Sequence, residues 1–177
     1  MMGCSFLWQG AGFAFSTLFG TLLHFLYDWT GGSILAALFS GVNESTWEHM
    51  KLLYWPMFLF ALIQRRFFRE QKNYWCVKGL GILLGLALIP ILFYTYNGAL
   101  GTSPDWVNIG IFYVSAALAY LLEWRLFQQD RLTCKRPWLA LAGVCLAGAL
   151  FVIFTFAPPQ LPLFRDPLTM TSGISGH

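Results

Sequence analysis

The run VKGLGILLGLALIPILFYTY, residues 77–96, is apolar over the length of one bilayer crossing. A membrane-spanning helix needs about 20 predominantly apolar residues, because the hydrocarbon core of a bilayer is about 30 Å thick. The rest of the 177-residue chain has the same character, with 57% hydrophobic and 11% charged residues and a mean hydropathy of +0.59. Soluble domains carry about 25% charged residues. The sequence therefore predicts an integral membrane protein built as one compact domain.

Five apolar windows approach the length of a membrane span: about 6–27, 47–64, 77–96, 106–127 and 137–156. We therefore expect an all-α fold with about five transmembrane helices in a single domain, residues 1–157. A shorter apolar piece, residues 31–42, is flanked by glycine and is expected to form a re-entrant or interfacial helix. Residues 158–177 are punctuated by proline and are expected to form an extended extracytoplasmic tail.

Charge bias sets the expected orientation. Nine of the eleven Lys and Arg residues lie in, or within three residues of, the connections between the second and third windows and between the fourth and fifth. Because cytoplasmic connections are enriched in Lys and Arg, we expect a multi-pass protein of the cell membrane with its N-terminus inside and its tail outside. The formal net charge of +3 is too small to suggest a nucleic-acid partner.

The four cysteines show no C-x-x-C spacing: Cys4, Cys76, Cys134 and Cys145. Three of them fall on the side that the charge bias marks as cytoplasmic, where thiols stay reduced. We therefore expect no disulfide framework.

Polar residues gather at the outer ends of the first two windows. On the first, small or polar residues recur every four positions and so share one helix face: Gly12, Ser16, Gly20, His24 and Asp28. The second begins with Ser45 and Glu48 in the spacing of a capping box, and His49 lies one turn past that cap. Ionisable residues inside membrane segments usually mark functional positions, so these two helix ends predict one site facing the cell exterior.

The residue types of this site predict metal chemistry. We expect His24, Asp28 and His49 to hold a metal, zinc first, because zinc is bound by imidazole and carboxylate groups with one position open for water. Glu44 and Glu48 are alternative or additional carboxylate ligands. Glu44, Glu48 and Lys51 are expected to act in catalysis as general base and as a cation for developing negative charge. Residues expected to contact a substrate are Asn43, Trp47, Asp105, Arg165 and Asp166.

Each of these residues also has a structural interpretation. Ser45 and Glu48 could serve only as the helix cap, and Glu44 could do no more than favour the helix dipole. Lys51 could extend its charge to the interface, and His24 alone would more often be a hydrogen-bonded interior histidine.

Three segments carry a family resemblance: the His-x3-Asp pattern at 24–28, NESTWEHMK at 43–51 and PLFRDPLT at 162–169. They resemble a family of small polytopic bacterial membrane proteins classed as a domain of unknown function. The resemblance covers essentially the whole chain and implies that the three segments belong to one site, without implying an activity. Ser45 and His49 are also similar to the Ser-x3-His element of the superfamily that includes alkaline ceramidases and adipoQ receptors. The later His-x3-His element of that superfamily is absent here, and the chain is two spans shorter.

Three function classes remain open from the sequence. The first is a metal-dependent hydrolase acting on a lipid or peptide at the outer leaflet. The second is a module that captures an ion or small molecule, similar in chain length to the substrate-capture subunits of vitamin transporters. The third is a non-catalytic subunit of a membrane complex or homo-oligomer, in which the polar cluster is a structural network.

Overall fold

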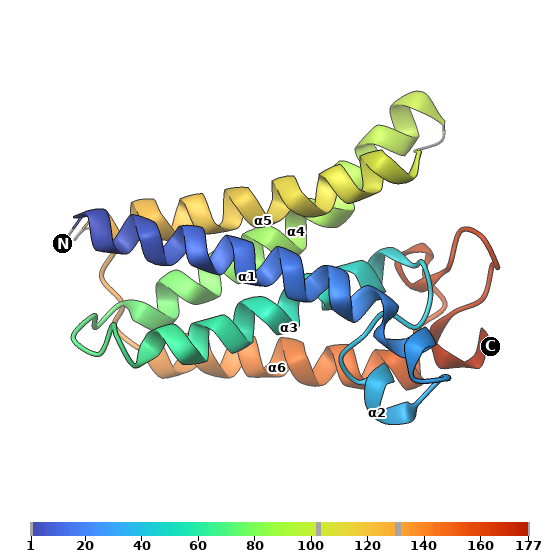
Figure 1. The fold of residues 1–177 in the computed structure, drawn as a ribbon, viewed down its shortest axis with the longest axis horizontal. Coiled ribbons are helices and arrows are strands. Elements are labelled where there is room, and N and C mark those ends of the chain that lie inside the picture. Colours follow the sequence, from blue (N-terminus) through green and yellow to red (C-terminus); the bar gives the residue numbers. More distant parts are fainter. Residues whose placement is uncertain (1, 102–103, 130–131, 177) are drawn as a thin grey trace.

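The computed structural model describes residues 2–101, 104–129 and 132–176, and within them the fold is all-α, as predicted. Five long helices lie side by side and alternate in direction (Figure 1): α1 Met2–Trp29, α3 Thr46–Arg65, α4 Tyr74–Leu100, α5 Asp105–Gln128 and α6 Pro137–Phe156. The short helix α2, Ile34–Ala37, lies at the end of the bundle that also holds the C-terminal tail. We call this the site end, and the opposite end, near the N-terminus, the basic end.

Four of the long helices are long and apolar enough to cross a membrane: Ser5–Trp29 of α1, and α4, α5 and α6 in full. The sequence predicts five such helices, and the one that differs is α3. Its first two turns contain Glu48, His49 and Lys51, and its last turn contains Gln64 and Arg65, so its mean hydropathy is lower.

Helix α3 forms the centre of the bundle. Eleven of its twenty residues are buried, and it packs against α1, α4 and α6. Its core side chains include Leu53, Tyr54 and Met57, each at most 1% exposed. The close approach of α6 to α3 depends on glycine, because a Cβ at Gly148 of α6 would overlap the Tyr54 side chain of α3. The Tyr54 hydroxyl donates to the Val144 carbonyl of α6 at 2.8 Å.

The small-residue face of α1 packs against the bundle, as its spacing predicts. A Cβ at Gly12 would overlap the Tyr120 and Phe60 rings, and one at Gly20 would meet the Leu52 carbonyl and the Phe112 ring. Between them the Ser16 and Tyr120 hydroxyls are hydrogen-bonded at 2.7 Å. This close packing places the end of α1 beside the start of α3.

The apolar piece at 31–42 is mostly not helical. Gly31 and Gly32 adopt positive φ angles of 64° and 79°, and only four residues, Ile34–Ala37, form α2. Ile34 and Leu35 are exposed, while Ala36 and Ala37 are buried. The segment is therefore a turn with a short helix at the site end.

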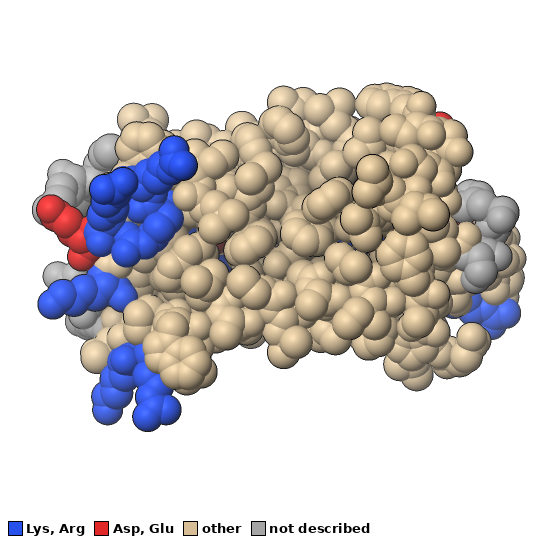
Figure 2. Space-filling view, turned by 90° about the horizontal axis from the view of Figure 1, so that it is seen from below, with Lys and Arg blue, Asp and Glu red and all other residues tan. Residues whose placement is uncertain are grey.

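Basic side chains gather at one end of the molecule (Figure 2). Those that the structure places in or beside the connections of the basic end are Arg65, Arg66, Arg69, Lys72, Arg125, Lys135 and Arg136. Lys78, counted with this group in the sequence, instead lies in the second turn of α4 and forms a buried ion pair with Glu123 of α5, with Nζ and Oε2 2.6 Å apart. Arg131 lies outside the described residues.

The expectation that no disulfide forms is wrong. Cys76 in the first turn of α4 and Cys134 in the α5–α6 connection form a disulfide, with Cα atoms 6.2 Å apart. They are separated by 58 residues, and only the packing of the helices brings them together at the basic end. Cys145 is free and exposed.

Candidate metal centre

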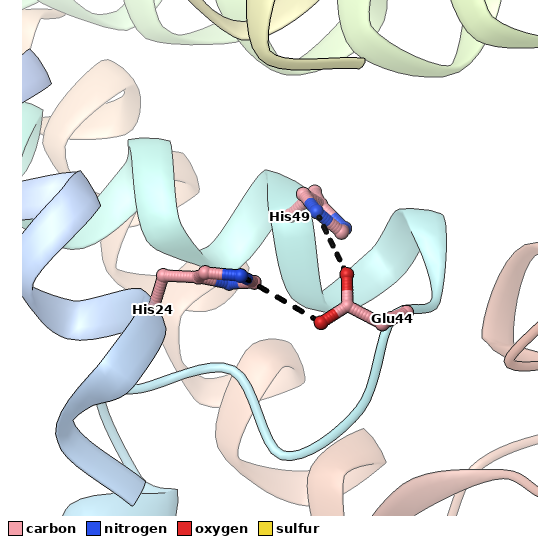
Figure 3. A group of neighbouring side chains, drawn as sticks. All are labelled: His24, Glu44 and His49. Atoms are coloured by element: carbon pink, nitrogen blue, oxygen red, sulfur yellow. Dashed lines mark ion pairs between the residues drawn. The ribbon is translucent and has the colours of Figure 1, made fainter. Parts of the chain in front are cut away.

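Three side chains from three elements meet at the site end (Figure 3): His24 near the end of α1, Glu44 in the segment before α3, and His49 in the first turn of α3. His24 Nε2 lies 3.6 Å from Glu44 Oε1, and His49 Nε2 lies 3.5 Å from Glu44 Oε2. One ligand atom of each residue lies within 4.8 Å of the others, so the group could hold a metal ion. We call it the His/Glu/His group.

The two His–Glu distances, each to a different Glu44 oxygen, are close to the separation of two ligands in a tetrahedral metal site. With zinc bonds of about 2.0–2.1 Å to nitrogen and oxygen, two ligands at the tetrahedral angle are about 3.4 Å apart. The side chains are 32%, 43% and 27% exposed for His24, Glu44 and His49. The group is therefore reachable from outside, yet partly held by the fold.

The orientation of His49 is fixed by the helix cap. Its Nδ1 lies 3.0 Å from the Ser45 carbonyl oxygen, which can only accept, so Nδ1 donates there and Nε2 faces Glu44. Metal-binding histidines usually donate their second nitrogen in this way. The Ser45 hydroxyl in turn accepts from the Glu48 backbone N–H at 3.4 Å, so one half of the predicted capping box is present.

The C-terminal tail holds the segment that carries Glu44. Asp166 Oδ2 accepts from the Glu44 backbone N–H at 3.2 Å, and Asp166 Oδ1 accepts from the N–H groups of Leu168 and Thr169. Burial tends to raise the pKa of Asp166, but the N–H groups of Leu168, Glu44 and Thr169 outweigh it and hold this pKa below its ordinary value. The Asn43 amide adds a hydrogen bond to the Gly173 carbonyl at 3.2 Å.

Aromatic packing fixes the same tail. The Trp47 ring lies 4.5 Å from Phe151 of α6 and 4.7 Å from Phe164 of the tail, centroid to centroid. Gly173 has a φ of 64° and leaves no room for a Cβ beside the Thr155 carbonyl. The segments 43–51 and 162–169, which the family resemblance assigns to one site, therefore contact each other.

Glu48 and Lys51 lie apart from the His/Glu/His group, in the interior. Their charged groups form an ion pair, and they are 1% and 0% exposed. Lys51 Nζ also donates to the Ala37 carbonyl and the Thr155 hydroxyl at 2.9 Å each, and Glu48 accepts from the Val42 N–H at 3.2 Å. The pair joins α3 to α6 and to the segment after α2.

Two further predicted site residues, Asp28 and Arg165, lie outside the His/Glu/His group. Asp28 is exposed and is not among the three residues that could hold a metal in the described part of the chain. Arg165 is exposed and donates from Nε to the Met170 carbonyl at 3.3 Å. The sequence groups Asp28 with His24 because they share a helix face, whereas Glu44 takes this place because the chain turns back after α2.

A cavity of about 350 Å³ adjoins the group between α3, α4, α5 and the tail. Glu44 and His49 form part of its wall, and so does Asp105, which the sequence predicts as a substrate contact. Asn97 and Asn108 also line it and were not singled out from the sequence, although each is a polar residue near the end of an apolar window. A metal bound at the His/Glu/His group would thus border a space large enough for a small molecule.

These features define the chain as a helical membrane protein with a possible metal group at one end of its bundle. A family model described as "Family of unknown function (DUF6512)" matches residues 5–174, and the chain belongs to this family. No curated protein and no solved structure matches the chain.

Proposed function

We propose that this protein is a metal-dependent membrane hydrolase whose His24, Glu44 and His49 hold a zinc ion at the outer face. The observation that carries the proposal is the His/Glu/His group beside an open cavity. Two histidines and one glutamate are a ligand set of catalytic zinc sites, in which the fourth position is left to water. Zinc in such a site lowers the pKa of its bound water and polarises a carbonyl group.

The surrounding residues support this role. His49 is oriented by the Ser45 carbonyl, and Glu44 is positioned through its backbone by Asp166. Partners of this kind typically change metal affinity by 10- to 100-fold when removed. Asp105 is the carboxylate in the cavity wall that stays outside the ligand set, and it is the candidate general base.

We further propose that α3 is a fifth membrane crossing, with the basic end in the cytoplasm and the site end outside. The Lys and Arg residues of the basic end favour this orientation, whereas the Cys76–Cys134 disulfide at the same end favours the opposite one. A helix of 20 residues is about 30 Å long, enough for the hydrocarbon core. The charged side chains Glu48 and Lys51 are enclosed by protein, and Leu59 and Leu62 present an apolar outer surface, 47% and 44% exposed. Single cysteines at Arg69 and Leu168, in a background without the native cysteines, should react with impermeant reagents from opposite sides of the membrane.

Elemental analysis of chelator-free, detergent-purified protein tests the metal site. The wild type should contain about one zinc per chain, and His24→Ala, Glu44→Gln and His49→Ala should each lose it while remaining monodisperse. Glu70→Gln, at the basic end, is the matched control for Glu44→Gln. A wild-type protein that binds no transition metal after incubation with zinc would overturn the proposal.

The cavity favours ligand capture as a second candidate function. Capture needs the cavity and its polar wall but no turnover. If the zinc-loaded protein binds a ligand in the cavity and releases it chemically unchanged, the result supports capture and contradicts hydrolysis of that ligand.

A further inference from the structure

The cavity beside the His/Glu/His group changes polarity along its length. Toward the site end its α4 wall passes through Ile89, Phe93, Asn97 and Gly101. In the same direction its α5 wall passes through Phe112, Ile111, Asn108 and Asp105. Because the two helices are antiparallel and packed together, the apolar residues of both walls lie deeper in the bundle and the polar residues nearer its end. One end of the cavity is therefore built for hydrocarbon and the other for a polar group.

The polar end is rich in hydrogen-bond acceptors. It contains the carboxylates of Glu44 and Asp105, and the Asn97 amide nitrogen donates to the Phe93 carbonyl, which leaves the Asn97 amide oxygen as an acceptor. Among the residues that the structure describes, none of those lining the cavity is Lys or Arg. Lys51 is enclosed by its partners, and Arg165 donates to the backbone of the tail. In the metal-free protein an anionic head group would meet the Glu44 and Asp105 carboxylates with no Lys or Arg among the described residues of the cavity wall, whereas a donor would be matched.

We propose that the cavity binds a single-chain amphiphile whose head group is a hydrogen-bond donor without negative charge, an amine or a hydroxyl. The head lies between Asp105, Asn97 and the His/Glu/His group, and the start of the hydrocarbon chain lies against Ile89 and Phe112. The volume of about 350 Å³ is at the lower end of the range for ligand pockets, which fits a head group and the first part of a chain. As the substrate class of the hydrolase, this inference rests on the proposed function, but binding itself needs only the cavity.

The test is calorimetric titration of the full chain, freed of metal by chelator, in phosphatidylcholine nanodiscs with three probes of equal chain length: dodecylamine, dodecanol and dodecanoate. Empty nanodiscs correct for partition into the bilayer. Dodecylamine and dodecanol should bind saturably at about one per chain, and dodecanoate at least about tenfold more weakly, because a like charge beside Asp105 is unfavourable. Equal binding of dodecanoate and dodecylamine would overturn the proposal.

Two variants locate the bound probe. Ile89→Trp fills the apolar end and should abolish saturable binding of both preferred probes. Asp105→Asn should weaken dodecylamine by about tenfold and leave dodecanol within about twofold, because only the amine is charged. Binding that survives Ile89→Trp unchanged would place the probe elsewhere and overturn the proposal. Leu83→Trp, on an exposed part of α4, is the matched control.

His24→Ala separates this proposal from the metal proposal, because His24 is a ligand of the group but not part of the cavity wall. If this variant lacks zinc and still binds dodecylamine, the cavity proposal stands independently. If the wild type contains zinc but binds neither dodecylamine nor dodecanol saturably, the metal proposal stands and the cavity proposal is overturned. If the wild type takes up no zinc but binds both probes, the cavity proposal stands and the metal proposal is overturned.

Discussion

The bundle buries one Glu–Lys pair in each half, and the two pairs differ in their surroundings. At the site end, Glu48 and Lys51 share their hydrogen bonds with the Val42 N–H, the Ala37 carbonyl and the Thr155 hydroxyl. At the basic end, Lys78 binds Glu123, whose second oxygen Oε1 has no partner among the described residues. The first pair is part of a hydrogen-bond network that joins three segments. The second is a single hydrogen-bonded ion pair between two helices, and Lys78 Nζ also lies 5.6 Å and 5.3 Å from the ring centroids of Phe60 and Tyr120.

At the site end, the difference in exposure distinguishes the charged residues that hold the fold from those that can bind a ligand. Glu48 and Lys51 are enclosed and fully engaged, whereas His24, Glu44 and His49 are between 27% and 43% exposed and point toward one another. A buried, fully partnered pair is suited to hold α3, α6 and the loop in place. A half-exposed group whose ligand atoms face one another is suited to bind a metal ion.

The largest expected effect is at the Lys78–Glu123 pair, in which Glu123 has no other hydrogen-bond donor among the described residues. Lys78→Met leaves Glu123 buried without a cation, and we expect the free energy of unfolding to fall by about 3–5 kcal/mol. Unfolding in mixed detergent micelles measures it. The double variant Lys78→Met/Glu123→Leu should recover most of the loss, because no unpaired charge remains. A double variant as unstable as the single one would mean that packing around Gly81, where Glu123 fills the space of a Cβ, dominates instead.

A smaller effect is expected for the networked pair. Lys51→Met leaves Glu48 with the Val42 N–H and Thr155 hydroxyl as donors, so the loss should be about 2 kcal/mol. The same unfolding measurement, made beside Lys78→Met, gives the comparison. A loss for Lys51→Met equal to or above that for Lys78→Met would show that the surrounding hydrogen bonds do not compensate the charge.

The fold was largely predictable because its signals are local. Apolar windows and the cap at Ser45 gave helix positions within a few residues, and α6 at its observed bounds. The partners of charged residues were not predictable, because they depend on which helices pack together. Lys78 and Glu123 are 45 positions apart and the two disulfide cysteines 58, and neither separation carries a periodic signal.

The candidate site was predictable in part for the same reason. His24 and His49 follow from their places on two helix ends, and 43–51 and 162–169 were noticed as related segments. The position of Glu44 between the histidines depends on the non-helical turns of 31–42 and on the hydrogen bond from its N–H to Asp166. A contact made by a loop and a tail has no helical period to reveal it.

The tail gives the next prediction. Asp166→Ala removes three backbone hydrogen bonds to a buried carboxylate and should lower the free energy of unfolding by about 1–3 kcal/mol. It should also weaken zinc binding by about tenfold, because Glu44 loses its support. Isothermal titration with zinc measures the second effect. Glu70→Ala, which removes an exposed carboxylate at the basic end, is the control, and equal losses in both variants would contradict a specific role for Asp166.

The Asp166 carboxylate also predicts a pH dependence of the tail, with a smaller effect than that of its replacement by alanine. Its pKa is lower in the folded protein than the ordinary value of about 3.9, so Asp166 stabilises the docked tail above that pH. This stabilisation is lost as the pH falls from about 4 through the lowered pKa. Proteolysis within the tail should therefore accelerate below about pH 4 in the wild type. Asp166→Asn should cleave rapidly at all pH values, and a wild type with a flat profile would contradict the prediction.

The smallest effect is expected at Asp28, and it sharpens the comparison between the sequence pattern and the fold. Asp28 and His24 are one turn apart on α1, which favours them as a ligand pair, yet Asp28 is exposed and the carboxylate between the two histidines is Glu44. Asp28→Asn should leave the zinc affinity within about twofold of the wild type, since an exposed charge outside the ligand set acts only through a screened Coulomb interaction. Titration in low and high salt measures this residual effect. A tenfold loss at high salt would mean that Asp28 enters the ligand set when the metal binds, and the group would then contain two carboxylates.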